Sequence, residues 1–96
     1  MIKLKLTASS QKDLRSIYQY SKINFGENQA FEYVHGLRKT IGLLKSNPYL
    51  GREDTILSRH FYRLVYRQNV IYYTVTDDQL TIRRILDARQ DPLRHL

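Results

Sequence analysis

The first residues of the chain alternate strictly between apolar and charged side chains. Ile2, Leu4 and Leu6 fall on one side of an extended backbone, and Lys3 and Lys5 fall on the other, because successive side chains of a strand point to opposite faces. This alternation predicts a strand over residues 2–6 with one buried face.

Helical spacing follows the strand. Ser10 and Asp13 stand three residues apart and resemble a capping box, so we expect a helix from this point to about Phe25, ended by Gly26. The expected buried face of this helix consists of Leu14, Ile17, Tyr18, Ser21 and Phe25.

A second apolar stripe begins after Gly26. Its members recur every three or four residues, which is typical of an amphipathic helix, and they are Ala30, Val34, Leu37, Ile41 and Leu44. Asn47 and Pro48 end the pattern. Two helices separated by a break of roughly two or three residues predict an antiparallel hairpin.

The last part of the chain changes to strand patterns. Residues 47–58 contain Pro48 and Gly51 and are expected to form a surface loop. Aromatic and β-branched residues then dominate three stretches, HFYRLVYR, NVIYYTV and QLTIRRIL, and Asp77-Asp78 predicts a tight turn between the last two. We therefore expect residues 1–96 to form a single α+β domain, β-α-α-β-β-β. Its hairpin would cover a sheet that contains a three-stranded antiparallel meander.

Charge gives the first indication of function. The 96 residues carry a formal net charge of +7, which favours an anionic partner. All six lysines precede residue 46, whereas eight of the ten arginines follow residue 51. Since guanidinium groups bind carboxylate or phosphate bidentately, the second half is the expected contact half. Charge that merely keeps the protein soluble remains an open alternative.

Other features of the composition bear on the compartment. The chain has no cysteine, which favours a reducing environment. No apolar stretch approaches the length of a membrane span, and the first residues lack the layout of a signal peptide. We therefore expect a cytoplasmic protein that does not associate with membranes.

Few residues offer metal or catalytic chemistry. His35, His60 and His95 are too scattered for a metal motif, and neither a phosphate-binding glycine loop nor a nucleophile elbow is present. We expect no metal and no cofactor. The eight tyrosines are expected mainly to pack, with base stacking beside an arginine as the alternative.

Arg83 and Arg84 are neighbours in the last predicted strand. Alternation places them on opposite faces, with Arg83 exposed and Arg84 among apolar residues. A guanidinium in such a position needs a partner. We therefore expect Arg84 to reach the margin of the sheet or to pair with Asp87 or Asp91.

Five stretches spread over almost the whole chain share their order and spacing with one known family. They are DLRSIYQY, FGENQAFEY, LLKSNPYLGR, YRLVYRQNVIYY and IRRILDARQDPLRHL. Together they resemble the ParE branch of the RelE/ParE toxin superfamily, the toxins of bacterial type II toxin-antitoxin modules. The family often has alanine, tryptophan and histidine where this chain has Ser10, Phe25 and Asp87. A carboxylate at position 87 weakens a catalytic interpretation and leaves a binding surface intact.

The resemblance implies a toxin that inhibits or poisons DNA gyrase without being an enzyme. It also implies a hetero-oligomer with a cognate, ParD-like antitoxin, whose acidic and flexible tail neutralises the toxin. The expected target-binding residues are Arg63, Arg83, Arg89 and Arg94.

Two alternatives remain open. RelE-like members of the superfamily cleave messenger RNA on the ribosome, and the catalytic candidates for such an activity are Arg63, Arg84, Arg89 and His95. The resemblance implies a C-terminal tyrosine in RelE-like sites, and no tyrosine follows Tyr73, so the gyrase interpretation is favoured. An inactive homologue that only binds its antitoxin is the third possibility.

Overall fold

The computed structural model describes residues 2–58 and 60–96. In chain order its elements are β1 (Lys3–Leu6), α1 (Ala8–Phe25), α2 (Glu27–Leu43), β2 (Arg52–Glu53), β3 (Phe61–Tyr66), β4 (Asn69–Val75), β5 (Gln79–Asp87) and the 3-10 turn η1 (Pro92–Arg94). The described strands form one sheet in the order β1-β5-β4-β3-β2. β1 runs parallel to β5, and the other neighbours are antiparallel. The predicted α+β order is confirmed, and β2 is an addition within the predicted loop.

Long-range contacts of Gly51 explain β2. The Gly51 amide donates a hydrogen bond to Tyr73 Oη at 2.9 Å, and a Cβ at residue 51 would lie only 2.6 Å from the backbone oxygen of Arg63. This close approach of two backbones requires glycine. It brings the two residues of β2 alongside β3, which no local pattern predicts.

α1 begins earlier than the sequence predicts. Thr7 is its N-cap, and Thr7 Oγ1 accepts a hydrogen bond from the Ser10 amide at 3.1 Å. Ser10 is buried, and its own hydroxyl donates to the carbonyl of Thr7 at 2.9 Å. The predicted capping box of Ser10 and Asp13 is therefore wrong. Threonine is also a favourable N-cap residue, and Asp13 bonds to β5 instead.

A single residue joins the two helices. Gly26 has φ 92°, which glycine adopts without steric penalty, so the break is shorter than predicted. The predicted end of α1 at Phe25 is confirmed, although Phe25 itself is 62% exposed rather than buried. The predicted stripe of α2 is confirmed at Leu37 and Ile41, both of which are buried.

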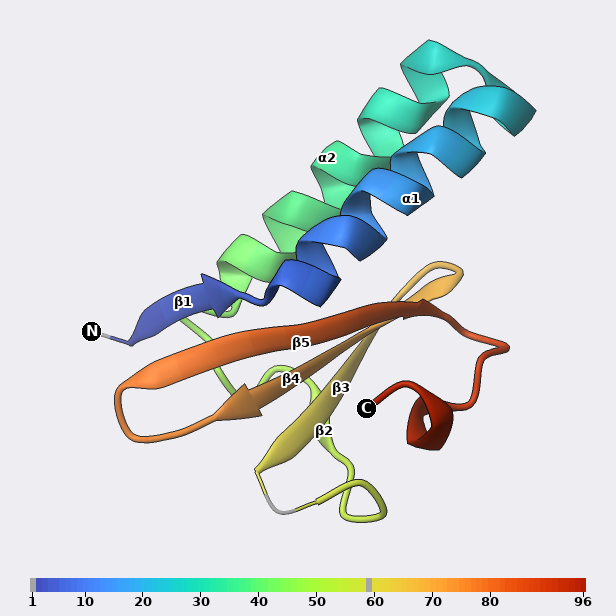
Figure 1. Cartoon of the computed structure of the whole chain (residues 1–96). Coiled ribbons are helices and arrows are strands. Elements are labelled where there is room, and N and C mark those ends of the chain that lie inside the picture. Colours follow the sequence, from blue (N-terminus) through green and yellow to red (C-terminus); the bar gives the residue numbers. More distant parts are fainter. Residues whose placement is uncertain (1, 59) are drawn as a thin grey trace.

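The hairpin covers one face of the sheet, and its tip extends beyond the strands (Figure 1). The helical side of the core consists of Leu14, Leu37, Ile41 and Leu44. The strand side consists of Ile71, Tyr73, Val75, Leu80, Ile82 and Ile85. Each fully buried aliphatic side chain contributes about 1.5–3 kcal/mol to stability. Within residues 2–58 and 60–96, no helix has both the length and the apolarity needed to cross a membrane.

A β-bulge interrupts β5. Tyr72 pairs with Arg84 and Tyr73 pairs with Ile82, so Arg83 is an additional residue on β5. A bulge breaks the regular alternation of side chains between faces. The spacing of two residues that the sequence suggested for this strand therefore fails at Arg83.

The face of the sheet away from the hairpin, here called the outer face, carries a second and smaller apolar cluster. It consists of Val70, Tyr72 and Leu86, with Leu57 packed against it. Arg83 Nε donates to Thr74 Oγ1 at 3.1 Å, and Arg84 is paired with Tyr72, so both arginines leave the backbone on this face. The prediction that they lie on opposite faces is wrong because of the bulge.

Candidate functional site

A cleft of about 650 Å³ lies between the hairpin and one end of the sheet. α1 and α2 form one wall, and the turn between β3 and β4 together with the end of β5 forms the other. Its apolar and aromatic lining includes Ile17, Tyr20, Phe25, Tyr33 and Tyr66, and its cations are Arg67, Arg84 and Arg89. Phe25 and Tyr20 are both 62% exposed. The cleft thus combines uncovered aromatic surface with three guanidinium groups, and its acidic residues are Asp13, Glu32 and Asp87.

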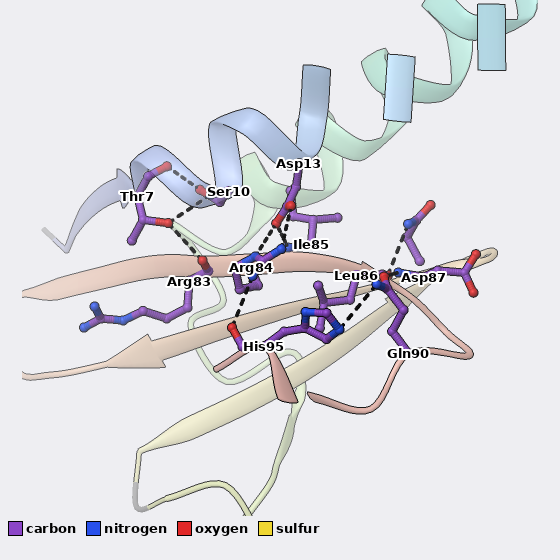
Figure 2. Close-up of polar contacts among 11 residues, drawn as sticks. Thr7, Ser10, Asp13, Arg83, Arg84, Ile85, Leu86, Asp87, Gln90 and His95 are labelled. Carbon is purple, nitrogen blue, oxygen red and sulfur yellow. Dashed lines mark hydrogen bonds and ion pairs between the residues drawn. The ribbon is translucent and has the colours of Figure 1, made fainter. Parts of the chain in front are cut away.

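Asp13 joins α1 to β5 at the base of the cleft (Figure 2). Its carboxylate accepts hydrogen bonds from Arg84 Nε at 2.8 Å, from Arg84 Nη2 at 3.0 Å and from the Ile85 amide at 2.9 Å. Hydrogen bonding to Asp13 raises the pKa of the Arg84 guanidinium. Arg84 does reach the margin of the sheet as predicted, but the predicted partners Asp87 and Asp91 are wrong.

These contacts lie where β1 ends and leaves the edge of β5 unpaired. Thr7 Oγ1 donates to the Arg83 carbonyl at 2.9 Å, and Asp13 accepts from the next amide on that edge, that of Ile85. An unsatisfied strand edge attracts other strands. Side chains from the start of α1 therefore continue the hydrogen bonding that β1 no longer supplies.

Arg84 also contacts the C-terminal tail, residues 88–96. Arg84 Nη1 donates to the His95 carbonyl at 3.2 Å, and Gln90 Oε1 accepts from the Asp87 amide at 2.9 Å. The imidazole of His95 lies beside Gln90 Nε2, at 3.5 Å. The tail therefore folds back below the sheet, on the side away from the hairpin (Figures 1 and 2).

Asp87 pairs with Arg89 at the rim of the cleft. Arg89 Nε and its backbone amide both donate to Asp87 Oδ1 at 2.9 Å. Hydrogen bonding from the Arg89 side chain lowers the pKa of Asp87. The Arg89 side chain is 88% exposed, so its guanidinium remains accessible to a partner in the cleft.

Arg63 lies on the outer face instead. It is paired with Tyr72 across β3 and β4, and its guanidinium lies 5.8 Å from the centroid of the Tyr72 ring. Asp54 approaches it at 3.7 Å. Burial raises the pKa of Tyr72, and Arg63 acts in the opposite direction.

The structure divides the predicted target-binding residues between two surfaces. Arg63 and Arg83 lie on the outer face, and Arg94 is exposed in η1 on the same side. Arg89 lies at the cleft. The predicted catalytic candidates are divided in the same way: Arg63 is on the outer face and Arg89 at the cleft. Arg84 pairs with Asp13, and its contact with His95 is to the backbone carbonyl rather than to the imidazole.

Sequence reasoning missed several residues of these surfaces. Asp13 was interpreted as part of a cap, and its bond to Arg84 spans 71 positions. Phe25 was expected in the core, and Arg67 was not among the predicted site residues. Among the described residues, no group of three or more histidine or acidic side chains could hold a metal ion.

Comparison with known proteins identifies the family. Residues 4–92 match the family described as ParE toxin of type II toxin-antitoxin system, parDE. Toxin ParE1 of Caulobacter vibrioides is 28% identical over 92 residues, which cover 96% of this chain and 95% of that protein. Toxin ParE1 of Mycobacterium tuberculosis is 26% identical over 92 residues, covering 95% and 94%.

Solved structures share the fold. The chromosomal ParDE TA system from P. aeruginosa has a TM-score of 0.80 at 22% identity, covering 91% of this chain and 96% of that one. The YoeB dimer from Staphylococcus aureus has a TM-score of 0.58 at 16% identity, covering 93% and 98%. The family match spans nearly all of the chain. The chain therefore belongs to the ParE toxins of type II toxin-antitoxin systems.

Proposed function

We propose that this toxin inhibits DNA gyrase and that a cognate, ParD-like antitoxin neutralises it by placing an acidic and apolar segment in the cleft. The observation that supports neutralisation is the lining of the cleft, where exposed aromatic side chains adjoin Arg67 and Arg89. Membership of the ParE family supports the gyrase target.

The chemistry of the cleft suits a segment that folds on binding. Tyr20 and Phe25 offer apolar surface that gains about 25 cal/mol for each Å² covered, and Arg67 and Arg89 offer charge-assisted hydrogen bonds to carboxylates. Flexible acidic segments commonly use such mixed grooves. The solved structures titled DinJ-YafQ complex and heterotetrameric complex of YoeB-YefM agree with a toxin-antitoxin hetero-oligomer.

The outer face and the tail are the proposed gyrase-binding surface. Arg63, Arg83 and Arg94 lie there, away from the proposed antitoxin cleft. A poison needs only a rigid binding surface, whereas a nuclease needs groups that move protons at the scissile bond. The charge of Arg84 is paired with Asp13, and the His95 imidazole lies beside Gln90, so a non-enzymatic mechanism is favoured.

Two assays on the purified chain test this proposal. Gyrase with relaxed plasmid should lose supercoiling activity or accumulate linear DNA when the toxin is added. Messenger RNA translated in a purified ribosome system should stay intact. Cleavage of that RNA with unaffected gyrase would refute the gyrase target and support the RelE-like alternative.

Single substitutions separate the two surfaces. Arg63→Ala should reduce gyrase inhibition at least tenfold and leave antitoxin affinity unchanged, because Arg63 lies outside the cleft. Arg89→Ala should weaken antitoxin binding about tenfold through loss of a charge-assisted contact. Arg15→Ala, an exposed change on α1 outside the cleft, is the control and should affect neither. Equal effects of Arg63→Ala and Arg89→Ala in both assays would contradict the division.

A further inference from the structure

Four residues on neighbouring strands lie opposite one another across the outer face. Arg52 of β2 pairs with Arg63 of β3, Arg63 pairs with Tyr72 of β4, and Tyr72 pairs with Arg84 of β5. Residues directly opposite each other on paired strands share a face of the sheet. Three arginines therefore surround one tyrosine along a line perpendicular to the strands.

Arg52 and Arg63 are an unfavourable pair for the isolated fold. Like charges placed directly opposite on neighbouring strands destabilise a sheet. The charge of Arg63 is only partly compensated, because its Nη1 lies 3.7 Å from Asp54 Oδ2 and its side chain remains 40% exposed. Among the residues that the structure describes, Arg52 takes part in no salt bridge. Arg52 therefore lacks a compensating carboxylate within the described part of the chain, which suggests that an external anion stabilises the pair.

The bulge adds a further cation beside these four residues. Arg83 is exposed, and its Nε is bound to the neutral hydroxyl of Thr74, so its charge is not neutralised there. Arg84 differs, because Asp13 pairs with its guanidinium on the α1 side. The available positive charge of the outer face therefore lies on Arg52, Arg63 and Arg83.

We propose that these three arginines, here called the arginine row, bind the phosphodiester backbone of a nucleic acid. Neighbouring strands lie about 4.8 Å apart, so the row from Arg52 on β2 to Arg83 on β5 spans roughly 14 Å across the strands. That distance corresponds to about four nucleotides at the rise of 3.4 Å for each strand of a duplex. Guanidinium groups match phosphate bidentately, and backbone contacts of this kind need no base recognition.

The chemistry of the row favours a nucleic acid over an acidic protein. Tyr72, which lies between Arg63 and β5, is only 2% exposed, so it offers no apolar surface to a partner of the row. Protein interfaces usually have an apolar centre, and in this molecule the cleft supplies one. A uniform polyanion needs only the cations. The inference goes beyond the proposed function, since it requires neither gyrase nor an antitoxin.

Fluorescence anisotropy with the whole chain tests the proposal. The probes are a labelled DNA duplex, a labelled single-stranded RNA and labelled poly-glutamate, each titrated at several salt concentrations. Three phosphate contacts predict a slope of log affinity against log salt of about −2.7 for the duplex and about −2 for the single strand. Comparison of the first two probes distinguishes DNA from RNA as the source of the phosphodiester.

A triple variant, Arg52→Gln with Arg63→Gln and Arg83→Gln, should lose at least tenfold in affinity and most of the salt slope. The control is Arg15→Gln with Arg38→Gln and Lys39→Gln, all exposed on the hairpin. Each triple variant lowers the formal net charge of +7 by three. The control should lose less than about threefold, because long-range charge alone contributes little once salt screens it.

Three results would overturn the proposal: equal losses in the two triples, no binding of either nucleic acid, or binding of poly-glutamate that depends on the row. If the row variant unfolds, Arg52→Gln alone repeats the test, since Arg52 is exposed and forms no salt bridge among the described residues. Its expected loss is about threefold. The supercoiling assay tests the proposed function separately. Nucleic-acid binding without gyrase inhibition would refute gyrase as the target and leave the proposed role of the arginine row intact.

Discussion

Asp13→Asn is the most informative single change for the architecture. Asparagine has the size of aspartate but keeps one acceptor oxygen and replaces the other with a donor. In the protein that carboxylate accepts from two guanidinium nitrogens of Arg84 and from the Ile85 amide. After the change, one oxygen must serve either Arg84 or Ile85, and the new amide hydrogens face a cation.

The burial of the pair sets the size of the effect. The side chains of Arg84 and Asp13 are 24% and 14% exposed. Removing one partner of a fully buried ion pair costs about 3–5 kcal/mol, and partial access of water reduces this. Hydrogen bonds to charged groups are worth about 1.5–3 kcal/mol. We therefore expect the free energy of unfolding to fall by about 2–3 kcal/mol.

Urea unfolding followed by circular dichroism measures this change. With a slope of about 1 kcal/mol per molar urea for a chain of this size, the midpoint should fall by about 2–3 M. Hydrogen exchange of the tail amides should also accelerate, because Arg84 then loses the anchor that orients it toward the His95 carbonyl. Asp87→Asn, which breaks the exposed pair with Arg89, is the control and should cost less than about 1 kcal/mol.

A double-mutant cycle decides whether the pair itself is responsible. Arg84→Met removes the cation, and the combination with Asp13→Asn should cost at least about 1 kcal/mol less than the sum of the two single changes. Additive single effects, or a loss below about 0.5 kcal/mol for Asp13→Asn, would show that Asp13 does not join α1 to β5 energetically.

Three further predictions concern other parts of the fold. Gly51→Ala should destabilise the fold by about 1–3 kcal/mol, because the new Cβ would meet the backbone oxygen of Arg63 at 2.6 Å. Gly42→Ala has open space around the new Cβ and should stabilise the fold by about 0.5–1 kcal/mol. Urea midpoints that shift in the same direction for both variants would refute this. Hydrogen bonding from Arg89 lowers the pKa of Asp87, so the pair stabilises the fold above the ordinary pKa of aspartate and loses that effect as pH falls through the lowered pKa. An NMR titration should show a higher pKa of Asp87 in Arg89→Ala than in the unmodified protein. An unchanged pKa would exclude the pairing. Burial raises the pKa of four tyrosines, so the neutral forms stabilise the fold below about pH 10 and unfolding should begin above it; stability that stays constant while phenolate absorbance rises would contradict this. These tyrosines are Tyr33, Tyr62, Tyr72 and Tyr73.

The sequence predicts those parts of the fold that have a local period. Alternation at residues 2–6 identifies β1, and the spacing from Ala30 to Leu44 identifies α2. β2 escaped prediction because two residues carry no period, and its position depends on the distant Tyr73 hydroxyl. The bulge at Arg83 escaped for a related reason, since alternation describes only regular pairing.

The sequence predicts which residue types form the candidate site but not how they are arranged in space. The arginines of the second half were expected to form contacts, but their division between the cleft and the outer face depends on how the sheet meets the hairpin. Asp13 shows the difficulty most clearly. A local motif explained its acidic side chain, and the true partner, Arg84, lies 71 positions away.

The distribution of the two cations bears on whether the charge serves solubility or binding. All six lysines are exposed, and no lysine takes part in a salt bridge among the described residues. Lys3 and Lys5 lie on the edge strand β1, where lysine discourages pairing with other chains. The described salt bridges and cation–π contacts all involve arginines. The lysines therefore suit solubility, whereas the described arginines after residue 51 either have specific partners or lie on the two surfaces proposed for binding.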